Sequence, residues 1–447
     1  MYNHVETPIL VSSFRILLKN ISVTIQSLYD IFLQHPSIQT DTRKLQPGDL
    51  FFALKGPNFN GNFFAAKALQ MGAAYAITDE PVRSKDERII ATNDVLTTLQ
   101  QLAKYHRDQF NIPFLAVTGS NGKTTTKELI HAVLSQRYKT YTTEGNFNNH
   151  IGIPLTLLRV KKDAEMAVIE MGANHQKEIE GYCIYTQPTH GIITNCGKAH
   201  LEGFGGEEGV RKGKGELFDF IRANNGTVFA FDDYSYLHDM SKGISNSVWY
   251  GINKGNITGH VLKTEPFLEV AITNDVALNN IQTQLVGDYN LPNVLCAVAV
   301  AKHFNVPDKK IKSAIENYTP SNSRSQLIEK GSNKIILDAY NANPSSMKVA
   351  IENFAGIHAA TKVLLLGGMM ELGEESIAEH KALIDLISQF NWQAVVLVGG
   401  DFKNVKHPYV YFDTAAEASA WLQQQRFENA FLLIKGSRSM AMEKVLS

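Results

Sequence analysis

A glycine-rich turn followed by a lysine and three threonines lies near the first quarter of the chain, and these are residue types that bind phosphate. The backbone N–H groups of such a turn converge on an anion, and the N-terminus of the following helix adds partial positive charge. Lys123 can reach the terminal phosphates of a nucleotide, and the hydroxyl of Thr124 or Thr125 can ligate Mg²⁺. The predicted phosphate site comprises Gly119, Ser120, Asn121, Gly122, Lys123, Thr124 and Thr125.

The flanking sequence distinguishes a phosphate site from an ordinary glycine turn. Val117 stands where the usual phosphate-loop pattern has its first glycine, so the spacing departs from that pattern. The apolar run over residues 114–117 predicts a buried strand before the turn, and Leu129, Ile130 and Val133 predict an amphipathic helix after it. A strand before the turn and a helix after it favour the phosphate site.

Further polar residues follow apolar runs. Asn148 and Asn149 belong to an Asn-rich segment, Glu170 ends the run over 166–170, and His200 comes soon after the run over 191–195. The carboxyl ends of parallel strands face the ligand crevice of such sheets, where a carboxylate oxygen suits Mg²⁺. We therefore predict Glu170 and His200 as metal ligands; an Asn-rich turn and a structural histidine are the alternative interpretations.

Strand and helix patterns alternate along most of the chain, which predicts an α/β protein with three domains. The first is a small α/β module, the second a parallel sheet around the phosphate loop, and the third a doubly wound, Rossmann-like domain. Residues 259–286 are more polar and alternating, which predicts a small antiparallel addition to the second domain. The predicted ranges are a candidate disordered extension at 1–20 and domains at 21–109, 110–319 and 320–447, with a hinge near Ser321 and Ser323.

Composition excludes several classes of protein. The 447 residues are 44% hydrophobic and 19% charged, which are globular values, and the net charge of −1 argues against a nucleic-acid-binding surface. No apolar run is long enough to span a bilayer, and the first twenty residues make a poor signal peptide. The three cysteines lack metal-ligand or disulfide spacing, so we expect a cytoplasmic protein.

Eight short motifs follow one another along the chain: TGSNGKTTT (118–126), NFNN (146–149), EMGA (170–173), HLEGFG (200–205), GDYNLPN (287–293), DAYNANP (338–344), MELG (370–373) and KGSRS (435–439). Taken in order, these motifs resemble those of the Mur ligase family over about residues 21–447. Any one motif is weak, but together they extend across all three predicted domains. The motif Asp-Ala-Tyr-Asn-Ala-Asn-Pro favours the member that adds a dipeptide, because the Asp-Asn-Pro-Arg motif of the member that adds the third residue is not found.

The resemblance implies an ATP-dependent ligase that joins D-alanyl-D-alanine to UDP-N-acetylmuramoyl-tripeptide through an acyl phosphate, in peptidoglycan precursor synthesis. It implies that Lys123 and Thr124 hold phosphates and Mg²⁺, that Glu170 and His200 ligate Mg²⁺, and that Lys214 is carbamylated. We expect a monomer. The implied nucleotide ligands beyond the phosphate loop are Asn290, Asn293, Arg324 and Asp338, and the implied substrate ligands are Asp41, Thr42, Arg43, Asn148, Asn149, Tyr340, Asn341 and Asn343.

Two other functions stay open at this point. One is a folylpolyglutamate-synthase-like or other amino-acid ligase with the same central domain, which the first predicted domain disfavours. The other is a nucleotide-binding switch or assembly protein that hydrolyses ATP slowly. A ligase, unlike a switch, releases phosphate only when both co-substrates are present.

Overall fold

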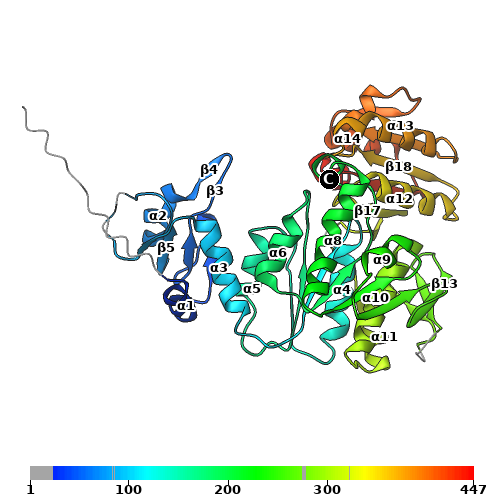
Figure 1. Ribbon diagram of the computed structural model, residues 1–447. Coiled ribbons are helices and arrows are strands. Elements are labelled where there is room, and N and C mark those ends of the chain that lie inside the picture. Colours follow the sequence, from blue (N-terminus) through cyan, green and yellow to red (C-terminus); the bar gives the residue numbers. More distant parts are fainter. Residues whose placement is uncertain (1–23, 83, 85, 274–277, 322) are drawn as a thin grey trace, which may run out of the picture. The chain divides into compact units, whose positions relative to one another are not determined.

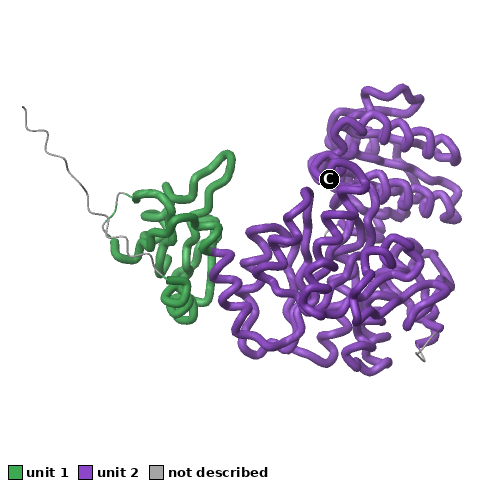
Figure 2. The backbone as a smooth tube through the Cα atoms, viewed as in Figure 1, with its two compact units in different colours: residues 1–98 green, residues 99–447 purple. Residues whose placement is uncertain are grey.

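The computed structural model describes residues 24–82, 84, 86–273, 278–321 and 323–447. The chain divides into two units, residues 1–98 and residues 99–447 (Figure 2). The predicted extension at 1–20 lies outside the described residues. None of the helices in the described part of the chain is long and apolar enough to cross a membrane.

The first unit is built on a four-stranded parallel sheet in the order β1-β2-β5-β6. All three residues of β2 are buried, as expected for an apolar run covered by helices. The division between the units falls within α3 (Val95–Arg107). The other elements are α1 (Ile25–Gln34), β1 (Ile38–Gln39), η1 (Thr42–Lys44), β2 (Leu50–Phe52), β3 (Lys55–Gly56), β4 (Phe59–Asn60), η2 (Gly61–Phe64), α2 (Ala65–Gln70), β5 (Tyr75–Thr78) and β6 (Ile89–Ala91).

A nine-stranded sheet forms the middle of the chain, and we call it with its helices the central domain (Figure 1). Every residue of β7 and β9 is buried, as the continuous apolar runs predict for parallel strands covered on both faces. The pairs β13–β14 and β14–β15 are antiparallel, which confirms the predicted addition. In spatial order the strands are β15 (Ile281–Gln282), β14 (Glu269–Ile272), β13 (Ile257–Lys263), β12 (Asn246–Gly251), β11 (Thr227–Phe231), β10 (His190–Ile193), β7 (Phe114–Thr118), β9 (Met166–Glu170) and β8 (Thr140–Thr142).

Two groups of helices pack against this sheet. Helices α4, α10 and α11 contact one another, and α6 contacts both α5 and α8. Helix α4 begins directly after the glycine-rich turn, where Gly122 has φ +79°, a left-handed conformation that glycine adopts readily. The helices are α4 (Lys123–Leu134), α5 (Gly152–Leu158), α6 (Glu178–Thr186), α7 (Leu201–Phe204), α8 (Glu207–Ala223), α9 (Ser235–Met240), η3 (Asp288–Asn290), α10 (Leu291–His303) and α11 (Asp308–Asn317).

The last part of the chain folds around a six-stranded sheet, which we call with its helices the C-terminal domain. Its strands are parallel except β16, which forms an antiparallel pair with β17. The strands in spatial order are β16 (Gln326–Lys330), β17 (Asn333–Asp338), β21 (Phe431–Lys435), β18 (Lys362–Gly367), β19 (Ala394–Val398) and β20 (Val410–Phe412). The helices are α12 (Pro344–Gly356), η4 (Gly373–Glu375), α13 (Ser376–Ile387), η5 (Gly400–Asn404), α14 (Ala415–Gln425), η6 (Arg438–Met440) and η7 (Met442–Leu446).

The predicted fold class, α/β with a small N-terminal domain, a central parallel sheet and a doubly wound last domain, is confirmed. Two strands of the last domain, β16 and β20, were not predicted. They are short edge strands whose residues are at most half-buried, so they lack the continuous apolar run by which buried strands are found. Glu170 ends β9 and Asp338 ends β17, so both carboxylates lie at the carboxyl ends of parallel strands.

A buried arginine ties the end of α3 to the central sheet. The guanidinium of Arg107 donates hydrogen bonds to the backbone oxygens of Thr186 (2.9 Å), Gln187 (3.0 Å) and Phe110 (2.9 Å). It also lies 3.9 Å from the ring centre of Phe114, the first residue of β7. Burial lowers the pKa of Arg107 to about 10, so the group stays charged at neutral pH.

We predict that Arg107→Ala lowers the free energy of unfolding of the second unit by roughly 2–4 kcal/mol, because it leaves three carbonyl groups without their charged donor. Lys104→Ala is the matched control on the same helix, since Lys104 forms an exposed pair with Asp108, and it should cost under about 0.5 kcal/mol. Urea unfolding followed by tryptophan fluorescence measures both. The chain's three tryptophans all lie in this unit, at Trp249, Trp392 and Trp421. Equal stability of the two variants would contradict the prediction.

Candidate active site

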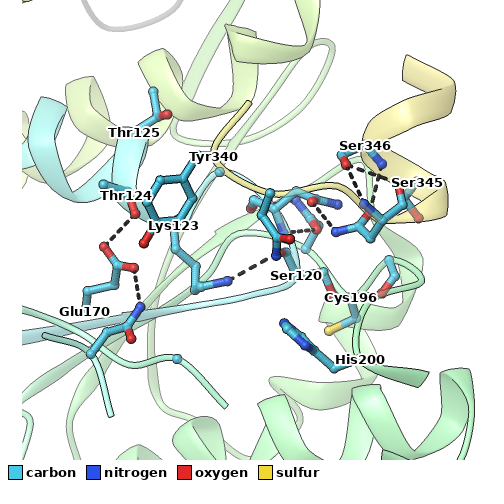
Figure 3. A pocket seen from close by; sticks show the side chains of 18 of the residues that line it. Ser120, Lys123, Thr124, Thr125, Glu170, Cys196, His200, Tyr340, Ser345 and Ser346 are labelled. Atoms are coloured by element: carbon cyan, nitrogen blue, oxygen red, sulfur yellow. Dashed lines mark hydrogen bonds between the residues drawn. The ribbon is translucent and has the colours of Figure 1, made fainter. Parts of the chain in front are cut away.

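A cavity of about 690 Å³ lies in the second unit and is lined by both the central and the C-terminal domain (Figure 3). It brings together most of the predicted site residues, although these are spread over more than 200 positions. Gly119 and Lys214 are not in its lining, and Asp41, Thr42 and Arg43 belong to the first unit. The predicted residues that line it are Ser120, Asn121, Gly122, Lys123, Thr124, Thr125, Asn148, Asn149, Glu170, His200, Asn290, Asn293, Arg324, Asp338, Tyr340, Asn341 and Asn343.

The glycine-rich turn is packed so closely that only glycine fits at two positions. A Cβ atom on Gly119 would lie 2.0 Å from Oγ1 of Thr194, and one on Gly122 would lie 2.7 Å from Oδ1 of Asn293. Both glycines have positive φ, +141° and +79°. The Lys123 ammonium donates to the backbone oxygens of Gly119 (2.6 Å) and Ser120 (3.2 Å), so it lies against the turn itself. This is the backbone and charge arrangement of a phosphate-binding loop.

Glu170 places a carboxylate against the first turn of α4. It is buried, and its two oxygens accept hydrogen bonds from Oγ1 of Thr124 (2.8 Å) and from Nδ2 of Asn148 (2.8 Å) (Figure 3). A carboxylate has about four acceptor sites, so each oxygen keeps lone pairs for a cation. The residues therefore fit Mg²⁺, which prefers one or two carboxylates with hydroxyl, phosphate and water oxygens. In the described part of the chain no three His, Cys, Asp or Glu side chains gather into a metal cluster, so a cation here would need such further ligands.

Two lysines of this region have lowered pKa values, and the charge of Lys123 contributes to the shift at Lys214. Burial lowers the pKa of Lys123 to about 8, an effect that the charge of Glu170 opposes and that of Arg324 increases. Lys214, in α8, is 1% exposed, and its Nζ donates to the backbone oxygen of Ala173 (2.9 Å). Burial, and secondly the charge of Lys123, lower the pKa of Lys214 to about 7. The neutral amine of Lys214 is therefore favoured relative to that of an exposed lysine.

The two asparagines predicted to contact adenine are engaged within the protein. Oδ1 of Asn293 accepts from Oγ1 of Thr126 (3.0 Å), and its Nδ2 donates to Oδ1 of Asn290 (2.9 Å). Nδ2 of Asn290 donates in turn to the backbone oxygen of Val286 (2.8 Å). This chain of hydrogen bonds ties α10 to α4, so both asparagines have a structural role beside any contact with a ligand.

The C-terminal domain adds charged and aromatic groups to the cavity. The guanidinium of Arg324 stacks over Tyr340, 3.6 Å from the ring centre. The Asp338 carboxylate accepts from the buried ammonium of Lys435 and from the backbone N–H of Ser325 (3.1 Å). Nδ2 of Asn343 donates to Oδ1 of Asn121 in the glycine-rich turn (2.8 Å), which links the two domains directly.

Comparisons with known proteins identify the family of the chain. Family models describe residues 36–109 as the catalytic domain of the Mur ligase family, 117–301 as the Mur ligase middle domain, and 323–438 as the Mur ligase glutamate ligase domain. The chain is similar to the UDP-N-acetylmuramoyl-tripeptide–D-alanyl-D-alanine ligases of Escherichia coli (34% identity, covering 95% of this chain and 98% of the relative) and Bacillus subtilis (31%, covering 92% of each). The chain belongs to the Mur ligase family.

Solved structures of such enzymes share the fold of this Mur ligase. A crystal structure of MurF from Acinetobacter baumannii is 29% identical, has a TM-score of 0.85, and covers 95% of this chain and 97% of that one. A structure of MurF ligase from Thermotoga maritima in complex with ADP is 25% identical with a TM-score of 0.83, covering 93% and 97%. Like the family, this Mur ligase is an ATP-dependent enzyme that forms an amide bond.

Several contacts of the site in this Mur ligase were not predicted as site features. Lys435 pairs with Asp338, Oγ of Ser345 accepts from the backbone N–H of Lys198 (2.9 Å), and Glu371 pairs with His200. Lys435 and Glu371 lie in motifs that carried the family resemblance, which was the available signal. Each contact joins residues 97 or more positions apart, and no local pattern gives such a pairing.

The residues predicted to bind the uridine nucleotide belong to the first unit and lie close together. Asp41 precedes η1, and its carboxylate accepts from the backbone N–H of Arg43 (3.0 Å) and from the Arg43 guanidinium (2.9 and 2.7 Å). These hydrogen bonds from Arg43 lower the pKa of Asp41 to about 2. Thr42 lies between them, and the Arg43 side chain stays 87% exposed, so a ligand can reach it.

Proposed function

We propose that this Mur ligase joins D-alanyl-D-alanine to UDP-N-acetylmuramoyl-tripeptide in peptidoglycan precursor synthesis, while ATP becomes ADP and phosphate. The observation that carries the proposal is one cavity lined by Lys123, Thr124 and Glu170 of the central domain and by Asp338 and Asn343 of the C-terminal domain. The names of its relatives support the choice of substrates. A cytoplasmic location and the domain ranges 21–109, 110–319 and 320–447 stay predictions.

In the first step, a carboxylate oxygen of the tripeptide attacks the γ-phosphorus of ATP. The new O–P bond forms as the bond to ADP breaks, and the product is an acyl phosphate. Activation is needed because a carboxylate oxygen is a poor leaving group. The N–H groups of the turn and the Lys123 ammonium stabilise the charge on the phosphoryl oxygens, and this electrostatic stabilisation with positioning supplies most of the catalysis.

In the second step, the amine of the dipeptide attacks the acyl carbon. A tetrahedral intermediate forms, the C–O bond to phosphate breaks, and the nitrogen loses one proton as the amide forms. We assign Asn148, Asn149, Tyr340, Asn341 and Asn343 to the peptide substrates. The sugar nucleotide is assigned to Asp41, Thr42 and Arg43, and the ATP phosphate and ribose to Arg324 and Asp338, with adenine near Asn290 and Asn293.

Thr124, Glu170 and His200 would hold Mg²⁺ in this site. Bound there, the ion would neutralise charge on the phosphoryl group in transfer. The support for this assignment is the free acceptor capacity of the buried Glu170 carboxylate between Thr124 and Asn148.

Lys214 is proposed to act as a carbamate. Its neutral amine would add carbon dioxide and release a proton, which gives a negatively charged carbamate in place of the amine. Burial and the charge of Lys123 favour the neutral amine. Lys212, two residues earlier on the same helix, is exposed and serves as a matched surface lysine.

The proposed reaction predicts that phosphate release requires ATP, the UDP-muramoyl tripeptide and D-alanyl-D-alanine together. Lys123→Ala should lower kcat about 10²–10³-fold because one well-placed cation is lost, whereas Lys212→Ala should stay near wild type. A phosphate-release assay measures this, with circular dichroism to check folding. Release without the two co-substrates would indicate a switch instead, and near-normal turnover by folded Lys123→Ala would exclude the assigned role of Lys123.

The carbamate predicts chemical rescue. Lys214→Ala should lose most of the activity, and formate or acetate should restore part of it by supplying a carboxylate in the vacated space. Lys212→Ala, measured in the same buffers, should neither lose activity nor respond. Full activity of folded Lys214→Ala in carbon-dioxide-depleted buffer would rule out a role for the carbamate.

A further inference from the structure

His200 receives a carboxylate partner from the other domain that lines the cavity. Its Nδ1 atom forms a hydrogen bond with Oε2 of Glu371, which lies 171 positions further along the chain, in the loop after β18. The backbone oxygen of Glu371 also accepts from the N–H of Glu202 (3.3 Å). One residue of the C-terminal domain therefore contacts both His200 and the start of α7.

The pairing of His200 with Glu371 is one of several contacts between the central and the C-terminal domain. Lys198 donates through its backbone N–H to Oγ of Ser345 (2.9 Å) and through its ammonium to Glu379 (2.6 Å). A Cβ atom on Gly373, two residues after Glu371, would lie 3.3 Å from the Glu202 side chain. Three segments of the C-terminal domain thus contact residues 198–202, at Ser345, at Glu379 and at residues 371–373.

Both paired residues adopt an uncommon backbone conformation. His200 has φ +53° and Glu371 has φ +62°, in the left-handed region that residues with a Cβ atom seldom occupy. Such residues persist where the surrounding structure fixes them. The two side chains are therefore presented to each other by backbone held on both sides of the domain contact.

The pairing decides which imidazole nitrogen is available. An ionised carboxylate only accepts hydrogen bonds, so Nδ1 of His200 must carry the proton that it shares with Glu371. In a neutral imidazole the lone pair is then on Nε2, the nitrogen that can bind a cation. The His200 ring lines the same cavity as Thr124 and Glu170. Carboxylates that accept from the second nitrogen of a metal-binding histidine fix its tautomer and ring orientation.

We propose that Glu371 is a positioning residue that fixes the tautomer and orientation of His200, so that the C-terminal domain completes the cation site of the central domain. The inference rests on the proposed role of His200 as a cation ligand. It makes cation affinity depend on contact between the two domains, although Glu371 itself does not touch the cation.

The test uses variants of Glu371 that take its left-handed backbone conformation into account. Glu371→Gly removes the carboxylate and suits φ +62°, whereas Glu371→Gln keeps an acceptor oxygen. Glu374→Gln removes the same charge three residues away, where the side chain is exposed, and is the matched control. Mn²⁺ serves as the probe, and its affinity for the full chain saturated with a non-hydrolysable ATP analogue is measured by electron paramagnetic resonance.

We expect Mn²⁺ affinity to fall about 10–100-fold in Glu371→Gly, to fall less in Glu371→Gln, and to stay at the wild-type value in Glu374→Gln. A second readout is the ¹⁵N spectrum of the histidine side chains, with the His200 signals assigned from His200→Asn. The wild-type ring should be protonated at Nδ1, and Glu371→Gly should shift the ring toward the Nε2-protonated form.

The outcomes distinguish the positioning role of Glu371 from the role of His200 as a cation ligand. If His200→Asn lowers Mn²⁺ affinity while Glu371→Gly and Glu371→Gln keep both the wild-type affinity and the wild-type tautomer, the positioning role of Glu371 is wrong and the proposed function stands. If His200→Asn itself binds Mn²⁺ as tightly as wild type, the assignment of His200 as a ligand fails. Tryptophan fluorescence verifies that each variant is folded.

Discussion

Charge is concentrated at the active site, where the half-buried Lys123 interacts with the buried carboxylate of Glu170 and with the buried Lys214, and this concentration of charge constrains the rest of the site. Burial lowers the pKa of Lys123 and of Lys214, and the charge of Lys123 lowers the pKa of Lys214 further. Glu170 opposes the effect at Lys123 and is itself held by Thr124 and Asn148. Charged groups are kept out of water at such cost only where ligands or partners compensate. Phosphate groups at Lys123 and a carbamate at Lys214 would both supply the missing negative charge.

The topology of the two parallel sheets explains where this charge is gathered. Glu170 ends β9 of the central sheet and Asp338 ends β17 of the C-terminal sheet, and both line one cavity. The carboxyl ends of parallel strands form the ligand crevice of an open α/β sheet. Direct contacts join the two edges, since Asn121 meets Asn343 and Lys198 meets Ser345. The phosphate loop and the residues opposite it are thereby held as one site.

Residues that act within a local pattern could be predicted from the sequence. The strand, turn and helix around Lys123 and the strand-terminal position of Glu170 follow from hydrophobic pattern and glycine spacing, and the structure has both. Partners from distant segments could not be predicted this way. The pair Lys435–Asp338 depends on which strands are neighbours in the C-terminal sheet, and the pair Glu371–His200 depends on how two domains pack, and no local pattern encodes either. Asn290 and Asn293 were predicted as adenine contacts, but their role in joining α10 to α4 became visible only in the structure.

The most direct test of the chemistry follows one oxygen atom. If Lys123 and the glycine-rich turn act by transferring a phosphoryl group to the substrate carboxylate, that oxygen must leave with phosphate when the amide forms. UDP-muramoyl tripeptide labelled with ¹⁸O in the reacting carboxylate should therefore yield phosphate that carries one ¹⁸O atom per turnover, measured by ³¹P nuclear magnetic resonance or mass spectrometry. Phosphate without the label, released while the amide product accumulates, would contradict activation through an acyl phosphate at this site.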